Sequence, residues 1–178
     1  MPRQHSDSQE FSRFIEADSV GTRPLERRIS ANAEERAALA RRFDLLALDR
    51  LEAVLELKRA GSGVVHVAGD LEADVVQACV VTLEPVPARI AERFTADFAA
   101  EDNLRAGDEE IGFEDQDPPE PIRNGHIDLG ELAAEQLALA LDPYPRAPGA
   151  AVPEAYAPGE AAGEGPAPSI NPFSILKK

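Results

Sequence analysis

The chain has 178 residues, of which 33 are acidic and 18 are lysine or arginine, so its formal net charge is −15 at pH 7. This length fits one domain of ordinary size with additional segments. The single cysteine excludes an intramolecular disulfide and a cysteine-rich zinc site, and no apolar run is long enough to span a membrane. We therefore expect a cytoplasmic protein without a membrane contact.

The first part of the chain predicts two short strands and a helix. Residues 1–10 are polar, which predicts a disordered start. Phe11–Ala17 and Leu25–Ala31 alternate loosely and are separated by turn-forming residues, a pattern typical of two strands. Asn32, with a glutamate three residues later, is the signature of a capping box. Apolar residues at helical spacing then predict a helix over Ala33–Leu46.

The middle of the chain predicts a sheet, because apolar and charged residues alternate with a period of two. This pattern covers Leu51–Leu57 and resumes at Val65. Gly69-Asp70 is interpreted as a turn or bulge within it. The run Val75–Leu83 is apolar on both faces, which predicts the most buried strand, and two prolines are expected to end it. A further strand with alternating aromatic and charged residues is predicted around Ile90–Phe98.

The next segment is strongly acidic and is followed by a second helix. Residues 101–120 hold nine carboxylates and one arginine, a density that predicts a flexible acidic loop over 101–121. Asp128 is a predicted N-cap, with Glu131 as the returning partner of a capping box. Ile127 and Leu132 occupy the positions of a hydrophobic staple, and prolines after Asp142 end the predicted helix.

Together these elements predict a single α+β domain over residues 11–145, a mostly antiparallel sheet with two helices packed on it. Residues 146–178 are rich in proline, alanine and glycine and are predicted to form a flexible tail. The end of this tail gathers apolar side chains, so we interpret it as a hook that docks into a partner or folds back on its own domain, with an unstructured end as the alternative. The candidate partner-binding residues of the hook are Asn171, Pro172, Phe173, Ile175 and Leu176.

The sequence shows none of the common patterns of a catalytic or metal-binding site. Cys79 lies within an apolar run and is interpreted as a core residue, and the three histidines lack zinc-ligand spacing. The acidic loop lacks the spacing of a calcium loop, and no phosphate-binding glycine motif is present. We therefore expect no catalytic residues, no cofactor and no metal ion.

Arginines gather in the first 60 residues, where basic and acidic side chains are equal in number. A local basic face could contact the phosphates of RNA, and the candidate RNA-contacting residues are Arg27, Arg28, Arg41 and Arg42. The alternative interpretation is that these arginines pair with nearby carboxylates on solvated faces. The few aromatic residues provide little surface for stacking on bases.

Three stretches of the chain are informative together, namely Leu71–Pro87, Ile127–Pro145 and Asn171-Pro172-Phe173. In their order and spacing they resemble the YceD family, most closely its alphaproteobacterial branch. The resemblance implies a bacterial protein needed for accumulation of the 23S ribosomal RNA, through its synthesis, processing or stability, with a ribosomal protein or a ribosome-assembly intermediate as partner. Many members carry two cysteines where this chain has Cys79 and Thr82, so a zinc site cannot be carried over.

Two functional classes follow from these observations. In the first, the chain is a non-enzymatic ribosome-biogenesis factor that acts through protein partners, because an acidic chain can accept basic ribosomal proteins. In the second, it binds ribosomal RNA directly through an arginine-rich face. Neither class involves DNA or a membrane.

Overall fold

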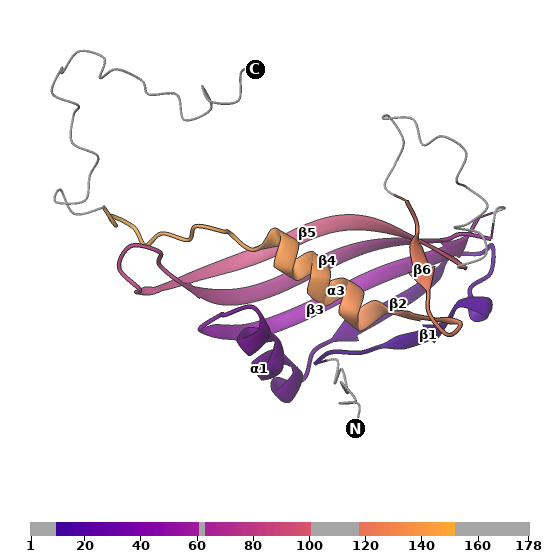
Figure 1. The fold of residues 1–178 in the computed structure, drawn as a ribbon, viewed down its shortest axis with the longest axis horizontal. Coiled ribbons are helices and arrows are strands. Elements are labelled where there is room, and N and C mark those ends of the chain that lie inside the picture. Colours follow the sequence, from indigo (N-terminus) through magenta and orange to yellow (C-terminus); the bar gives the residue numbers. More distant parts are fainter. Residues whose placement is uncertain (1–9, 61–62, 101–117, 152–178) are drawn as a thin grey trace, which may run out of the picture.

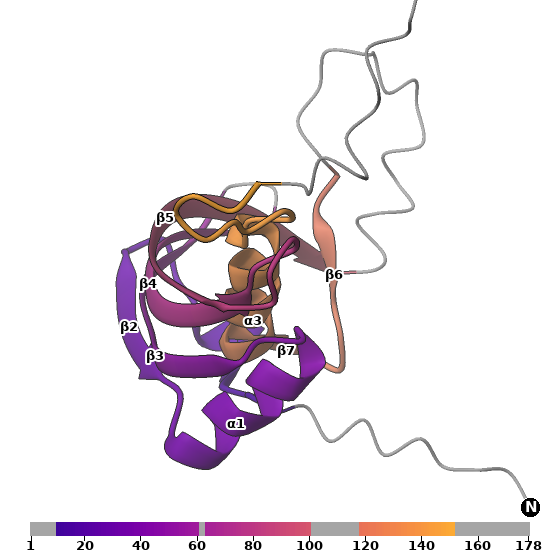
Figure 2. The same cartoon turned by 90° about the vertical axis from the view of Figure 1, so that its left-hand side faces the viewer.

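The computed structural model describes residues 10–60, 63–100 and 118–151, which form a curved sheet with helices on one face (Figures 1 and 2). This is the predicted α+β class. The strands are β1 (Phe14–Glu16), β2 (Leu25–Ser30), β3 (Ala47–Arg59), β4 (Val65–Ala78), β5 (Pro85–Ala100), β6 (Glu120–Ile122) and β7 (His126–Asp128). The helices are α1 (Ala33–Arg42), α3 (Leu129–Ala140) and the short 3-10 helix η1 (Ala17–Ser19).

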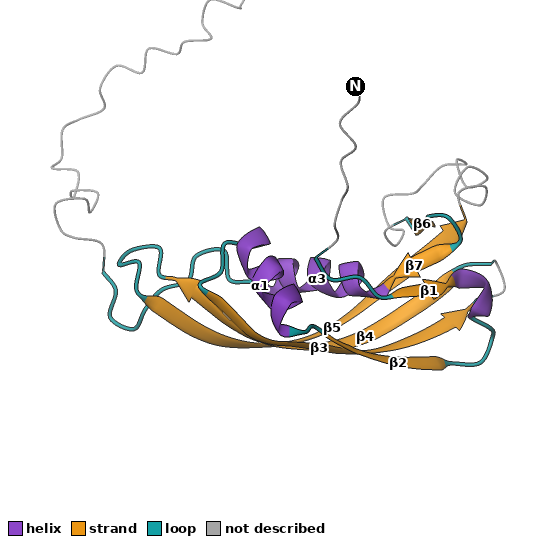
Figure 3. Ribbon diagram, turned by 90° about the horizontal axis from the view of Figure 1, so that it is seen from below, coloured by secondary structure: helices purple, strands orange, loops and turns teal. Residues whose placement is uncertain are grey.

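Five strands form the main sheet in the order β2-β3-β4-β5-β6, and β1 pairs with β7 in a separate two-stranded sheet. Neighbouring strands of the main sheet are antiparallel except β5 and β6, which are parallel. Figure 3 shows α1 and α3 on the same side of the sheet. Alternate residues of the central strands, such as Leu55 and Leu57 of β3 and Val65 and Val67 of β4, are completely buried. None of the helices in the described part of the chain could cross a membrane.

Both predicted helices are present, and each begins at the predicted N-cap residue. The Asn32 side chain accepts from two backbone N–H groups of α1, and Glu35 completes the capping box. This helix ends at Arg42, four residues earlier than expected, because Asp44 takes a left-handed conformation with φ of 53°. Asp128 caps α3, but the expected return of Glu131 is wrong, since the Glu131 carboxylate binds Arg42 instead.

The interpretation of Gly69-Asp70 as a turn or bulge is wrong. Gly69 lies in the middle of β4, in regular register with Leu55 of β3 and Phe94 of β5. A Cβ atom at this position would lie 2.4 Å from Cζ of Phe94. The glycine therefore makes room for an aromatic ring on the neighbouring strand.

The prediction for Val75–Leu83 is also wrong beyond Ala78. There β4 ends, and the following residues turn into β5 with Val80 48% and Leu83 76% exposed. The two prolines begin β5 rather than end a strand. Within the described residues, β5 is paired only with β4 along this stretch, so a missing N–H on its outer edge costs no hydrogen bond.

Parts of the predicted loop and tail are ordered. Residues 101–117 of the acidic loop lie outside the described residues, but Glu120 and Pro121 belong to β6 rather than to a loop. The tail was expected to begin at residue 146, yet the segment up to residue 151 is described. There the N–H of Ala147 donates to the sulfur of Cys79. Residues 1–9 and the hook also lie outside the described residues.

Candidate binding groove

An open groove with a volume of about 1070 Å³ lies at the end of the sheet where α3 begins. It is bounded by β1, β6, β7, the first turns of α3 and the last residue of α1. Phe98, Ile127 and Leu132 are buried side chains that contribute apolar surface, and Phe14 adds a ring that is 64% exposed. The charged lining residues are five carboxylates and two arginines, namely Glu10, Glu120, Asp128, Glu131, Glu135, Arg42 and Arg123. This lining has a formal excess of three negative charges.

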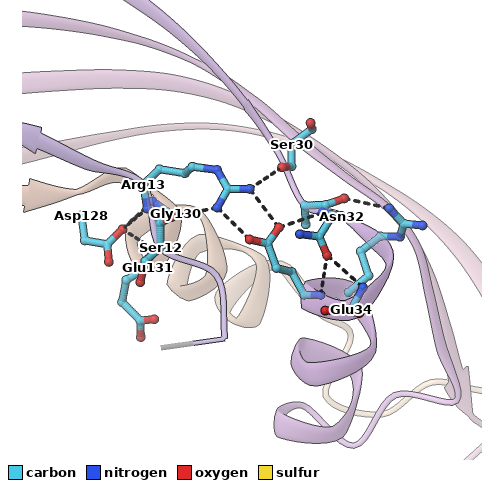
Figure 4. Close-up of polar contacts among 11 residues, drawn as sticks. Ser12, Arg13, Ser30, Asn32, Glu34, Asp128, Gly130 and Glu131 are labelled. Carbon is cyan, nitrogen blue, oxygen red and sulfur yellow. Dashed lines mark hydrogen bonds and ion pairs between the residues drawn. The ribbon is translucent and has the colours of Figure 1, made fainter. Parts of the chain in front are cut away.

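Asp128 joins the two sides of the groove. Its Oδ1 accepts from the backbone N–H groups of Gly130 at 3.0 Å and Glu131 at 3.3 Å, as expected of an N-cap. The same oxygen accepts from the N–H of Arg13 at 2.7 Å (Figure 4). The N–H of Leu129 in turn donates to the Arg13 carbonyl. The N-terminal segment is therefore fixed to the start of α3 by the residue that begins the helix.

The Arg13 side chain extends this junction to α1 (Figure 4). Its guanidinium binds both oxygens of Glu35, at 2.8 and 2.9 Å, and also donates to the Ser30 carbonyl. The hydrogen bond between them raises the pKa of Arg13 and lowers the pKa of Glu35. Because Glu35 also accepts from the N–H of Asn32, one carboxylate holds both the cap of α1 and the segment before β1.

Arg42 connects α1 with α3 across the edge of the groove. It binds the Glu131 carboxylate with two hydrogen bonds, at 3.0 and 2.7 Å, and lies 3.5 Å from Glu10. The hydrogen bond that Arg42 donates to Glu131 is the main reason that the pKa of Arg42 is raised. The positive charge of Arg42 therefore partly cancels the negative charges of Glu131 and Glu10.

Glu120 and Glu135 bring the remaining negative charge into the groove. Neither takes part in an ion pair with another described residue. Partial removal from water raises the pKa of Glu135, and the charges of Glu120 and Glu131 raise it further. Arg123 and Arg42 oppose this effect without cancelling it. A cation from outside the described residues would therefore be favourable at this position.

The groove also has one exposed aromatic pair. The rings of Phe14 and His126 meet edge to face, with centroids 6.2 Å apart. His126 is held from the other side, because its Nδ1 lies 2.8 Å from the Asn124 carbonyl oxygen and donates to it. Aromatic surface beside carboxylates suits a ligand that combines apolar and basic groups.

The four candidate RNA-contacting arginines do not share one face. Arg27 and Arg28 are consecutive in β2 and point to opposite faces of the sheet. Arg41 is exposed on α1, and Arg42 binds Glu131 at the groove. The clustering of arginines in the sequence does not show which of them share a face, because consecutive residues of a strand point to opposite faces of the sheet.

Two arginines on the uncovered face of the sheet, Arg50 and Arg93, pair with carboxylates. Arg50 lies 3.7 Å from Glu52, a neighbour in the sequence, and makes closer contacts with Glu72 and Asp74 on the adjacent strand. Sequence analysis missed these two partners because they depend on the β3–β4 register. Across the next pair of strands, Arg93 binds Asp70 at 2.8 Å.

Cys79 is buried, but it lies at a turn rather than inside a strand. Its Sγ accepts from the backbone N–H groups of Val81, Thr82 and Ala147 at 3.3 to 3.4 Å. These contacts, with that of Ala147 the largest, lower the pKa of the thiol to about 7. Among the described residues, no three side chains of the types that bind metals come together in one cluster.

Comparison with known proteins gives one match. The family model described as "Large ribosomal RNA subunit accumulation protein YceD" matches residues 67–178. No curated protein and no solved structure matches the chain. The matched range includes β6, β7, α3 and most of the groove lining, so the groove lies largely within the part of the chain that the family defines.

Proposed function

The chain belongs to the YceD family, and we propose that it is a non-enzymatic ribosome-biogenesis factor that promotes accumulation of 23S ribosomal RNA through a protein partner. The family description supports the role in accumulation of the large-subunit RNA. The groove supports a protein partner, and specifically a lysine- or arginine-rich segment of a ribosomal protein.

The observation that carries this proposal is the position of Glu120 and Glu135 above an apolar floor. The pKa of Glu135 is raised first by burial and then by the charges of Glu120 and Glu131, and a basic side chain between Glu120 and Glu135 would oppose this repulsion. Apolar neighbours of that side chain would cover Phe14, which is exposed although it is aromatic. Basic segments with intervening apolar residues provide both groups.

Direct RNA binding is less well supported. The groove has an excess of carboxylates, which repel phosphate. The arginines suggested for RNA contact lie on different faces, and Arg42 is already bound by Glu131. A phosphate would therefore compete with a carboxylate for Arg42 and would meet the other arginines separately.

The first test measures binding of the full chain to a fluorescent peptide that contains four lysines and two phenylalanines. In the variant Glu120→Gln/Glu135→Gln we expect binding to weaken roughly three- to tenfold, with a smaller dependence on salt, because two charge contacts are lost. The matched control Glu84→Gln/Glu92→Gln removes two exposed carboxylates outside the groove and should change affinity less than about twofold.

A crosslinked pull-down from cells, with and without RNase, then identifies the natural partner. The proposal expects ribosomal proteins that remain after RNase and depend on Glu120 and Glu135. Direct crosslinks to precursor 23S RNA that these two substitutions leave unchanged would contradict it and would favour the RNA-binding alternative.

A further inference from the structure

The last eight residues of the chain combine the two kinds of group that the groove accommodates. Phe173, Ile175 and Leu176 are large apolar residues, and they are followed by Lys177 and Lys178. The chain has only three lysines, and two of them stand here. The remaining basic residues are arginines, most of them in the first 60 residues. This segment therefore places two lysines directly after large apolar side chains.

The groove presents complementary surface of both kinds. Its apolar part consists of the exposed ring of Phe14 and the buried side chains beside it. Its charged part includes Glu120 and Glu135, two exposed carboxylates that take part in no ion pair with another described residue. Two lysines next to apolar side chains match two carboxylates next to an apolar floor.

The length of the chain allows the segment to reach the groove. The described residues end at position 151, near the β4–β5 turn and at the opposite end of the sheet from β6 (Figure 1). The longest strand, β5, has 16 residues and spans about 50 Å. Residues 152–170 can extend over roughly 60 Å, so a segment beginning at residue 171 can lie beside β6.

The family match supports treating the segment and the groove as parts of one pattern, because it runs from residue 67 through to residue 178. We infer that residues 171–178 dock in the groove of the same chain, with Phe173 against the exposed Phe14 and the two lysines at Glu120 and Glu135. The segment then occupies the place that a basic segment of a partner would take.

Photo-crosslinking of the full chain tests this inference. A photoreactive benzoyl-phenylalanine replaces Phe173, the chain is irradiated at low concentration, and the linked peptides are identified by mass spectrometry. We expect links to peptides that contain Phe14, Phe98 or Leu132. Links to the turn that contains Leu83, or to Tyr144, would overturn the inference, and so would the absence of internal links.

Two double variants test whether the two carboxylates hold the docked segment. Glu120→Gln/Glu135→Gln should lower the yield of groove links roughly two- to tenfold, whereas Glu84→Gln/Glu92→Gln should leave it unchanged. A yield that does not respond to the first variant would contradict the role of the two carboxylates.

A mixture of isotopically light and heavy chains separates docking in the same chain from docking in a second copy. Mixed links would overturn the inference, because it places the segment in its own groove. The experiment uses no partner, so its failure would leave the proposed role in RNA accumulation intact. Failure of the peptide-binding test would likewise leave internal docking open to this measurement.

Discussion

The two ends of the sheet are held by the same arrangement of hydrogen bonds around different atoms. At the groove end, Oδ1 of Asp128 accepts three backbone N–H groups, and at the other end Sγ of Cys79 does so. In each case two donors come from positions i+2 and i+3, and the third comes from a segment far away in the sequence. Arg13 is the distant donor to Asp128, and Ala147 is the distant donor to Cys79.

The difference lies in the acceptor. The carboxylate of Asp128 begins a helix and makes shorter, charge-assisted hydrogen bonds. The sulfur of Cys79 makes longer bonds, and its charge changes near neutral pH because its pKa is about 7. We therefore expect the groove end to contribute more to stability, and the opposite end to depend on pH.

The largest effect is expected for Gly130→Ala at the groove end. An added Cβ would lie 2.5 Å from the carbonyl oxygen of Phe11, a backbone atom that cannot move aside without breaking the junction. Although alanine favours a helix by about 1 kcal/mol, we expect a net loss of about 3 kcal/mol in the free energy of unfolding. Urea denaturation measures this loss. Gly21→Ala is the control, because no atom lies within 4 Å of a Cβ added at Gly21. Equal stability of the two variants would contradict the close packing at this junction.

Asp128→Ala should have the next largest effect. It removes the N-cap of α3 and leaves the N–H of Arg13 without its acceptor, which together should lower the free energy of unfolding by about 2 kcal/mol. Asp128→Asn keeps an acceptor oxygen and should lose about half as much. The same denaturation experiment distinguishes them. If both variants lost the same free energy of unfolding, the negative charge of Asp128 rather than its hydrogen bonds would stabilise the groove end of the sheet.

Cys79→Ser should have a smaller effect whose size depends on pH. The thiol pKa is lowered from 9.0 to about 7, so ionisation of the thiol stabilises the folded chain. This contribution is complete above pH 9, falls as the pH drops, and is absent below pH 7. Thermal unfolding between pH 6 and 9.5 should therefore show a difference between the wild type and Cys79→Ser that grows with pH. A difference independent of pH would show that the thiolate has no role.

Local signals in the sequence predicted the caps of both helices and the alternating strands correctly. Asn32 and Asp128 act through backbone groups two and three residues away, so a short stretch of sequence contains the whole interaction. The predictions failed where the deciding contact comes from a residue far away in the sequence. Gly69 was misinterpreted because the atom that requires a glycine there belongs to Phe94 on another strand.

The groove could not be predicted for the same reason. Its lining comes from segments that are separated along the chain and are brought together by β1–β7 pairing and by the position of β6 beside β5. Glu120 was assigned to a loop, and Glu135 has no motif around it. Likewise, no pattern in the sequence connects Cys79 with Ala147, 68 residues later.

The pairing of β1 with β7 also has a consequence for the order of folding. The β3–β4–β5 part of the sheet joins strands that follow one another in the chain, so its contacts close short loops. Phe14 and Asp128, in contrast, pair across more than one hundred residues and through only three positions on each strand. Closing so long a loop for so few contacts is entropically unfavourable, so this pairing should form late and open first. We therefore expect the β1–β7 side of the groove to be completed late in folding and to open before the main sheet does.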